Sequence, residues 1–160
     1  ADCDMKRCGD APLLVSRILF NSHGRARIYC RRRENYSAYA AALSHLPGAR
    51  ALVPALPQDA APYVFPLLVD DAERIYHALR RDGMPVFRWD RVWPGTPSLA
   101  GDHAPEWQRH LLQLLCHQDL SPADITDVCG AIRRLLQDQA DGQGLRGVGR
   151  AADSPLGTGA

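Results

Sequence analysis

The sequence predicts an α+β fold, in which a small, mostly antiparallel sheet has helices packed on one face. The first observation is the order of the expected elements along the chain: helix, two strands, helix, strand, long loop, strand, helix. The second is size and composition, because 160 residues with 46% hydrophobic and 23% charged residues suit one soluble domain with a real core. Composition and periodicity alone name no function.

The N-terminal part is expected to be one disordered segment followed by one helical segment. Residues 1–12 are polar and lack periodicity, so we expect disorder there. Residues 13–46 have helical periodicity, with glycine at Gly24 as a weak point and Pro47–Gly48 as the end. The apolar stripe of this segment consists of Tyr36, Tyr39, Leu43 and Leu46.

Two strands are expected next. Residues 49–56 contain Pro54, which predicts an edge strand because proline cannot donate a ladder hydrogen bond. Residues 62–70 are apolar at both odd and even positions, so both faces of this strand are expected to be covered. Pro66 within this run predicts an edge strand or a bulge at that point.

A helix and a third strand follow. Asp70 or Asp71 is suited to cap the helix, and Gly83 is suited to end it. In the strand at residues 84–90, side chains alternate between faces. Arg88 is therefore expected on the face of Val86, and Trp89 on the opposite face.

The C-terminal part has a long loop, a strand and the best marked helix. Residues 91–105 form the loop, and residues 111–116 are a buried strand. The helix begins with Ser121 as its cap, Pro122 at its first position and Asp124 three residues after the cap. Residues 141–160 are rich in glycine and alanine without a pattern, so we expect a disordered tail.

Charge and composition exclude several classes of protein. The formal net charge of +1 gives no overall attraction to nucleic acid or anionic membranes. No apolar run approaches the ~20 residues of a membrane span, and the N-terminus lacks the apolar stretch of a secretory signal. Five cysteines at irregular spacings do not make a disulfide framework, so we expect a reducing, cytoplasmic location.

Cys116 and His117 are adjacent in the sequence and invite interpretation as a nucleophile and its base. On a strand, successive side chains point to opposite faces, so the imidazole would not reach the thiol. The sequence therefore predicts a core strand with a polar tip, and no catalytic residue in the chain.

Four stretches in this order carry a resemblance to a known family: Arg31–Tyr36 (RRRENY), Pro62–Asp71 (PYVFPLLVDD), Gly83–Asp90 (GMPVFRWD) and Leu111–Leu120 (LLQLLCHQDL). Together they resemble the C-terminal small domain of DegT/DnrJ-type aminotransferases. These are fold type I enzymes that use pyridoxal phosphate (PLP), and many act on keto-sugars attached to nucleotides. The resemblance implies that residues 13–140 are a single small domain of an aminotransferase-like protein.

This chain departs from the family pattern in three respects. Leu115 stands where family members usually have proline, and the pair Arg88–Trp89 lies where many sugar aminotransferases carry a histidine and an aromatic residue. The large domain, which carries the cofactor lysine, is absent. The only lysine of the chain, Lys6, has no resemblance to the cofactor-lysine motif.

The resemblance therefore implies PLP in the full-length relative and predicts no stable binding of PLP to this chain. The expected partner is a large PLP-binding domain or a second subunit, since the family is homodimeric. A sheet built to pack on a larger domain would leave an apolar patch exposed, so we also expect low solubility or self-association.

The resemblance places Arg88, Trp89, His117 and Gln118 near the substrate cleft as candidate substrate-binding residues. For Arg88, the alternative is a surface arginine whose stem covers a core tryptophan. For His117, the alternative is a strand-end side chain that is satisfied by nearby backbone.

Two further clusters invite other functions. Arginines at five positions suggest binding of phosphate or nucleic acid, but the balanced charge favours a solvated helix face or a subunit contact; they are Arg25, Arg27, Arg31, Arg32 and Arg33. Cys3, Cys8, His23 and Cys30 contain zinc-binding residue types, but their spacing does not match a paired knuckle.

Three functions remain to be compared. The first is the small domain of a PLP-dependent aminotransferase that is inactive alone. The second is a stand-alone, non-catalytic binding module with the same fold, and the third is a zinc-dependent module.

Overall fold

The computed structural model describes residues 11, 13–22, 24–89, 91, 93–97 and 99–148. In chain order its elements are α1 (Leu14–Ser22), α2 (Arg25–Leu43), β1 (Ala49–Ala51), β2 (Val64–Val69), α3 (Ala72–Arg81), β3 (Val86–Arg88), α4 (Ala104–His110), β4 (Leu111–Leu115) and α5 (Pro122–Val148). The predicted α+β fold is confirmed.

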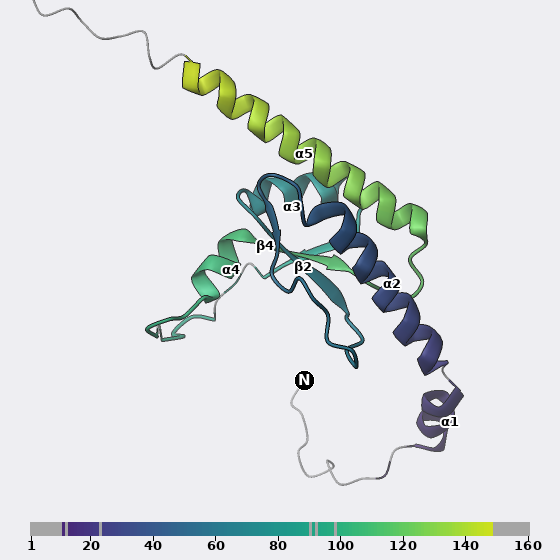
Figure 1. Cartoon of the computed structure of the whole chain (residues 1–160). Coiled ribbons are helices and arrows are strands. Elements are labelled where there is room, and N and C mark those ends of the chain that lie inside the picture. The colour runs from purple at the N-terminus through teal and green to yellow at the C-terminus, as the bar shows by residue number, and fades with distance from the viewer. Residues whose placement is uncertain are drawn as a thin grey trace, which may run out of the picture.

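The four strands form one antiparallel sheet in the order β1-β2-β4-β3 (Figure 1). The central pair is β2 and β4, in which Phe65 lies opposite Leu114 and Leu67 lies opposite Leu112. The outer strands are β1 on one side and β3 on the other, where Val86 lies opposite Leu114. The predicted edge position of the first strand is therefore confirmed.

The expectation of an edge strand or a bulge at Pro66 is wrong, because β2 lies between β1 and β4. The carbonyl of Pro66 accepts from the amide of Leu52, one residue after β1 ends. In an antiparallel strand the amide position of a residue faces the same neighbour as its carbonyl. The missing N–H of Pro66 therefore faces the end of β1, and the β2–β4 ladder loses no bond.

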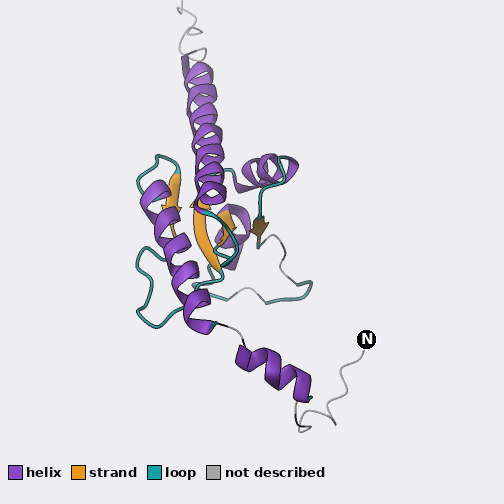
Figure 2. Ribbon diagram, turned by 90° about the vertical axis from the view of Figure 1, so that its right-hand side faces the viewer, coloured by secondary structure: helices purple, strands orange, loops and turns teal. Residues whose placement is uncertain are grey.

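One face of the sheet is covered by α2, α3 and α5, and the core lies between these layers (Figures 1 and 2). Phe65 is fully buried and contacts the rings of Tyr36 and Tyr39 at centroid distances of 4.9 and 5.8 Å. Beneath α3 and α5 the core continues with Ile75, Leu79, Leu112, Leu114 and Ile132. The prediction of helices packed on one face is confirmed for α2, α3 and α5.

The predicted helix over residues 13–46 is two helices, since α1 ends at Ser22 and α2 begins at Arg25. Glycine at the start of α2 weakens continuous helix at this point. Figure 1 shows α1 standing apart from the rest of the domain. Its apolar side chains are 54–71% exposed: Leu14, Val15, Ile18 and Leu19.

The predicted signals at the starts of α3 and α5 are present. The carboxylate of Asp71 accepts from the amide of Arg74, which caps α3. The hydroxyl of Ser121 accepts from the amide of Asp124, whose carboxylate accepts from the amide of Ser121, and this reciprocal pair caps α5. The Ser121 hydroxyl also donates to the Asp124 carboxylate at 2.7 Å, and this bond, followed by the one from the Ser121 amide, lowers the pKa of the Asp124 carboxyl.

The predicted disordered tail from residue 141 is wrong for residues 141–148, because α5 continues to Val148. The three glycines among residues 141–148 favour a tail, but each costs a helix only ~1 kcal/mol, and the segment continues an established helix. Disorder was also predicted for residues 1–12 and 149–160, and apart from residue 11 these lie outside the described part of the chain.

No helix among the described residues combines the length and the apolar character that crossing a membrane requires.

Candidate functional site

The four predicted substrate-binding residues lie at opposite ends of β4. Arg88 is paired with Leu112 near the start of β4, and Trp89 follows it. His117 and Gln118 come after Leu115, where β4 ends. At about 3.3 Å per residue, five residues of extended chain separate the two positions by about 16 Å. The chain therefore presents two candidate sites, one at each end of this strand.

The first site is a chain of polar side chains at the end of β4. The Arg32 Nε donates to Gln118 Oε1 at 3.0 Å, and Gln118 Nε2 lies 3.0 Å from His117 Nε2. His117 Nδ1 lies 3.4 Å from Asp119 Oδ2. The Gln118 amide nitrogen can only donate toward His117 Nε2, while His117 Nδ1 lies 3.4 Å from the backbone amide of Asp119 as well as 3.4 Å from its carboxylate.

This polar chain is held in place by α2. The buried amide of Asn35 donates to the carbonyl of His117 at 2.8 Å. The Arg32 guanidinium also lies over the Tyr63 ring, 5.6 Å from its centroid. The side chain of His117 stays 38% exposed. Contacts with α2 thus fix this site, and the His117 side chain remains accessible to a ligand.

Sequence reasoning missed Arg32, Tyr63 and Asp119 as members of this site. Arg32 had been counted with a cluster of arginines on one helix, and only the tertiary contact with Gln118 separates it from its neighbours. Arg31 and Arg33 have structural partners instead. Arg31 donates to the Leu120 carbonyl, and Arg33 donates to the carbonyls of Pro57 and Ala60.

The neighbouring thiol of Cys116 is not part of the site. Its side chain is fully buried, and its Sγ lies 3.8 Å from the Leu114 carbonyl. Burial raises the pKa of the Cys116 thiol to about 12 and outweighs the opposing charge of Arg32. A neutral buried thiol is a poor nucleophile, and its face of the strand belongs to the core.

At the other end of β4, the side chain of Arg88 lies largely covered between α3 and α4. Its side chain is 10% exposed, so the alternative of a surface arginine is wrong. The guanidinium donates to the Gln108 carbonyl at 2.9 Å and lies 3.9 Å from the Glu73 carboxylate, while its Nε is buried without a hydrogen-bond partner. Arg88 thus connects the start and the end of the β3–α4 loop.

Trp89 has a different environment from Arg88. Its ring is 51% exposed and lies 5.9 Å from the ring of Trp107 in α4. Trp107 in turn stacks with His103 at 6.1 Å. Trp89 is therefore available to a partner or ligand, while Arg88 beside it is committed to packing.

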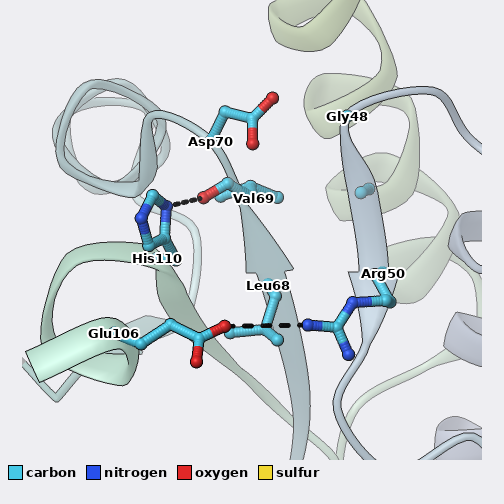
Figure 3. A pocket seen from close by; sticks show the side chains of 8 residues that line it. Gly48, Arg50, Leu68, Val69, Asp70, Glu106 and His110 are labelled. Atoms are coloured by element: carbon cyan, nitrogen blue, oxygen red, sulfur yellow. Dashed lines mark hydrogen bonds and ion pairs between the residues drawn. The ribbon is translucent and has the colours of Figure 1, made fainter. Parts of the chain in front are cut away.

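Two hollows lie near this end of the sheet. The first, of about 370 Å³, lies between β1, β2 and α4 (Figure 3). There the His110 Nδ1 donates to the Val69 carbonyl at 3.1 Å, and Arg50 lies 3.8 Å from Glu106. The second, of about 490 Å³, is lined by Arg88 and Arg109 but also by Asp70, Asp71 and Glu73.

The described residues do not fit PLP. The cofactor requires a lysine that forms an imine and a cradle for its phosphate. The only lysine of the chain, Lys6, lies outside the described residues. Carboxylates line both hollows and oppose a phosphate.

No group of three or more metal-ligating side chains occurs among the described residues. Of the residues considered for zinc, Cys3, Cys8 and His23 lie outside them, and Cys30 is exposed.

Known structures share this fold. No protein-family model and no curated protein matches the sequence. The chain is similar to DesV of S. venezuelae, solved with a ketimine intermediate (TM-score 0.62, 21% identity, 76% of this chain and 34% of that chain). It is similar to the aminotransferase TlmJ from Streptoalloteichus hindustanus (TM-score 0.60, 26% identity, 69% and 32%). A DegT DnrJ EryC1 StrS aminotransferase from Brucella abortus is a third example (TM-score 0.54, 16% identity, 76% and 34%).

The chain spans about a third of the length of these solved relatives. The similarity confirms, at the level of fold, the resemblance seen in the sequence motifs. The chain therefore has the fold of one third of a DegT/DnrJ-type aminotransferase.

Proposed function

We propose that this chain is the C-terminal small domain of a PLP-dependent aminotransferase of the DegT/DnrJ type. The observation that carries the proposal is the match of most of this chain to only a third of several aminotransferase structures. A large domain supplies the cofactor lysine and the phosphate cradle, and the small domain supplies one wall of the substrate cleft. The chain alone does not transaminate.

The end of β4 is the part of this wall that contacts substrate. Gln118 uses one N–H toward His117 and its oxygen toward Arg32, which leaves a second amide N–H for a ligand. The guanidinium of Arg32 keeps donors beyond the Nε that it uses. Hydroxyl, carbonyl and phosphate oxygens of a nucleotide-linked keto-sugar are suitable acceptors for such donors.

Trp89 is the candidate contact at the other end of β4, and Arg88 positions it. Because Arg88 is bonded to Gln108 and buried, it holds the β3–α4 loop and leaves substrate binding to the exposed indole. The two ends of β4 therefore contact different parts of a long substrate, or one substrate and the neighbouring subunit.

The test is a fusion of the full chain to the part of TlmJ that has no counterpart here. We expect the chain alone to show no imine absorbance with added PLP, and the fusion to show a stoichiometric band. A band in the chain alone that disappears on Lys6→Ala would contradict the assignment of the lysine to the large domain. A fusion that folds without binding PLP would favour a stand-alone binding module.

Substrate contact is tested in the same fusion by Gln118→Ala, with Gln137→Ala on the exposed side of α5 as the matched control. Loss of one hydrogen bond to substrate should raise KM for the keto-sugar by about fivefold, since such a bond contributes roughly 1 kcal/mol. The control should leave KM unchanged. Equal KM values for both variants would remove Gln118 from the site.

A further inference from the structure

The second face of the sheet is left uncovered by every helix among the described residues except α4. Side chains of β2 and β4 that point away from the core follow the register Val64–Leu115, Pro66–Gln113 and Leu68–Leu111. Leu68 and Leu111, at the end next to α4, are buried. The other positions are half-buried, and Phe87 on β3 is 43% exposed. We call this surface the open face: Val64, Pro66, Phe87, Gln113 and Leu115.

The composition of the open face does not suit contact with water. An antiparallel sheet with one solvated face alternates between apolar residues inside and polar residues outside. On the two central strands, five of the six outward positions are apolar, and Gln113 is the single polar one. β2 is apolar at both parities, which is typical of a strand buried on both faces, yet the described residues cover most of only one face.

We propose that the open face is the surface on which the large, cofactor-binding domain docks. This inference rests on the proposed function and deepens it by naming the surface. The identity of the docking partner is inferred from the chain lengths of the solved relatives. About two thirds of each of those chains lies outside the part that this fold matches. A docked domain gives the apolar residues of β2 and β4 the second layer that an α+β domain normally has.

The neighbouring aromatic residues extend the same surface. Trp89 lies on the side of Phe87, since side chains alternate along β3, and it is half-exposed next to Trp107. Tyr63, at the opposite end, has the parity of Phe65 and lies against Arg32 of α2, so it belongs to the helical side. Trp89 therefore borders the open face, and docking here places this end of β4 at the cleft between the two domains.

The first experiment labels side chains with a photoactivated carbene, in the full chain alone and in the fusion with the TlmJ part. We expect Phe87 and Leu115 to lose most of their labelling in the fusion, while Ala41 on the solvent side of α2 keeps its labelling. A fusion that binds PLP while Phe87 and Leu115 remain labelled contradicts the docking surface and leaves the proposed function intact. A fusion that folds without PLP contradicts both.

The second experiment uses the full chain alone, in case a fusion does not fold. An uncovered apolar face should bind an apolar dye and cause reversible association in sedimentation. Phe87→Glu should abolish both, with circular dichroism to show that the fold is kept, and Ala41→Glu is the matched control. A monomer that binds no dye contradicts the proposal. A discrete dimer that Phe87→Glu dissociates, with a face that stays labelled in the fusion, assigns the open face to a second copy.

Discussion

Leu114 and Leu115 are neighbours on one strand but have opposite surroundings. Leu114 points into the helical layer and is fully buried, while Leu115 points to the open face and is half-buried. The same contrast holds for the whole sheet, because three helices cover one face and most of the other is bare. The stability of this chain therefore comes mainly from one face, and the docking proposed above uses the other.

The largest expected effect is on the covered face. Leu114→Ala should lower the free energy of unfolding by about 2 to 5 kcal/mol, because it removes buried methyl groups and leaves a cavity under α3 and α5. Leu115→Ala should cost clearly less in the isolated chain, measured by chemical denaturation. Equal losses would mean that the open face is already packed in this chain.

Substitutions of two arginines, one covered and one exposed, test the same contrast at charged side chains. Arg88→Met should cost about 1.5 to 3 kcal/mol, because the Gln108 carbonyl loses a charged donor within a buried site. Arg50→Met should cost at most ~0.5 kcal/mol, since Arg50 is 68% exposed and lies 3.8 Å from Glu106. If Arg88→Met left the free energy of unfolding unchanged, Arg88 would not be needed for packing and would again be a candidate to bind substrate.

Alkaline pH should weaken the covered face selectively. Burial raises the pKa of Cys116 from 9.0 to about 12 and also raises the pKa of Tyr36. Above pH 9 the unfolded chain loses the thiol proton while the folded chain keeps it, so the free energy of unfolding falls as pH rises toward 12. Cys116→Val should flatten this decline, whereas Cys30→Ser, at an exposed cysteine, should not.

The smallest effect is expected at the polar residue of the open face. Gln113→Leu should change the stability of the isolated chain by less than ~0.5 kcal/mol, because the side chain is half-exposed and no helix among the described residues covers it. The same substitution should increase dye binding and association. A large destabilisation would indicate that Gln113 has a structural role in the sheet.

Local signals could be predicted from the sequence, and non-local ones could not. The caps at Asp71 and Ser121 depend on residues three positions apart, so the sequence contains all of the information. The order of the strands does not follow from any short segment. Pro66 is an example. Whether it removes a hydrogen bond from the sheet depends on which neighbouring strand its nitrogen faces. In the folded chain it faces the end of β1, which the sequence around Pro66 does not reveal.

The same distinction applies to the candidate site. His117 and Gln118 follow an apolar strand, which was enough to mark them as a polar tip. The contribution of Arg32 required its bond to Gln118, which is 86 residues away in the sequence. Arg88 was expected at a cleft because of a family resemblance, but the packing of α4 over its guanidinium commits it to structure.

The proline at the centre of β2 has a consequence for the behaviour of the protein in concentrated solution. Because the pairing of β1 with β2 stops at the ring of Pro66, β1 is only three residues long. It therefore offers only a short edge for pairing with strands of other molecules. Short edges are poor templates for the stacking that builds fibrils. Aggregates of this domain should therefore be amorphous and reversible, without the growth of amyloid.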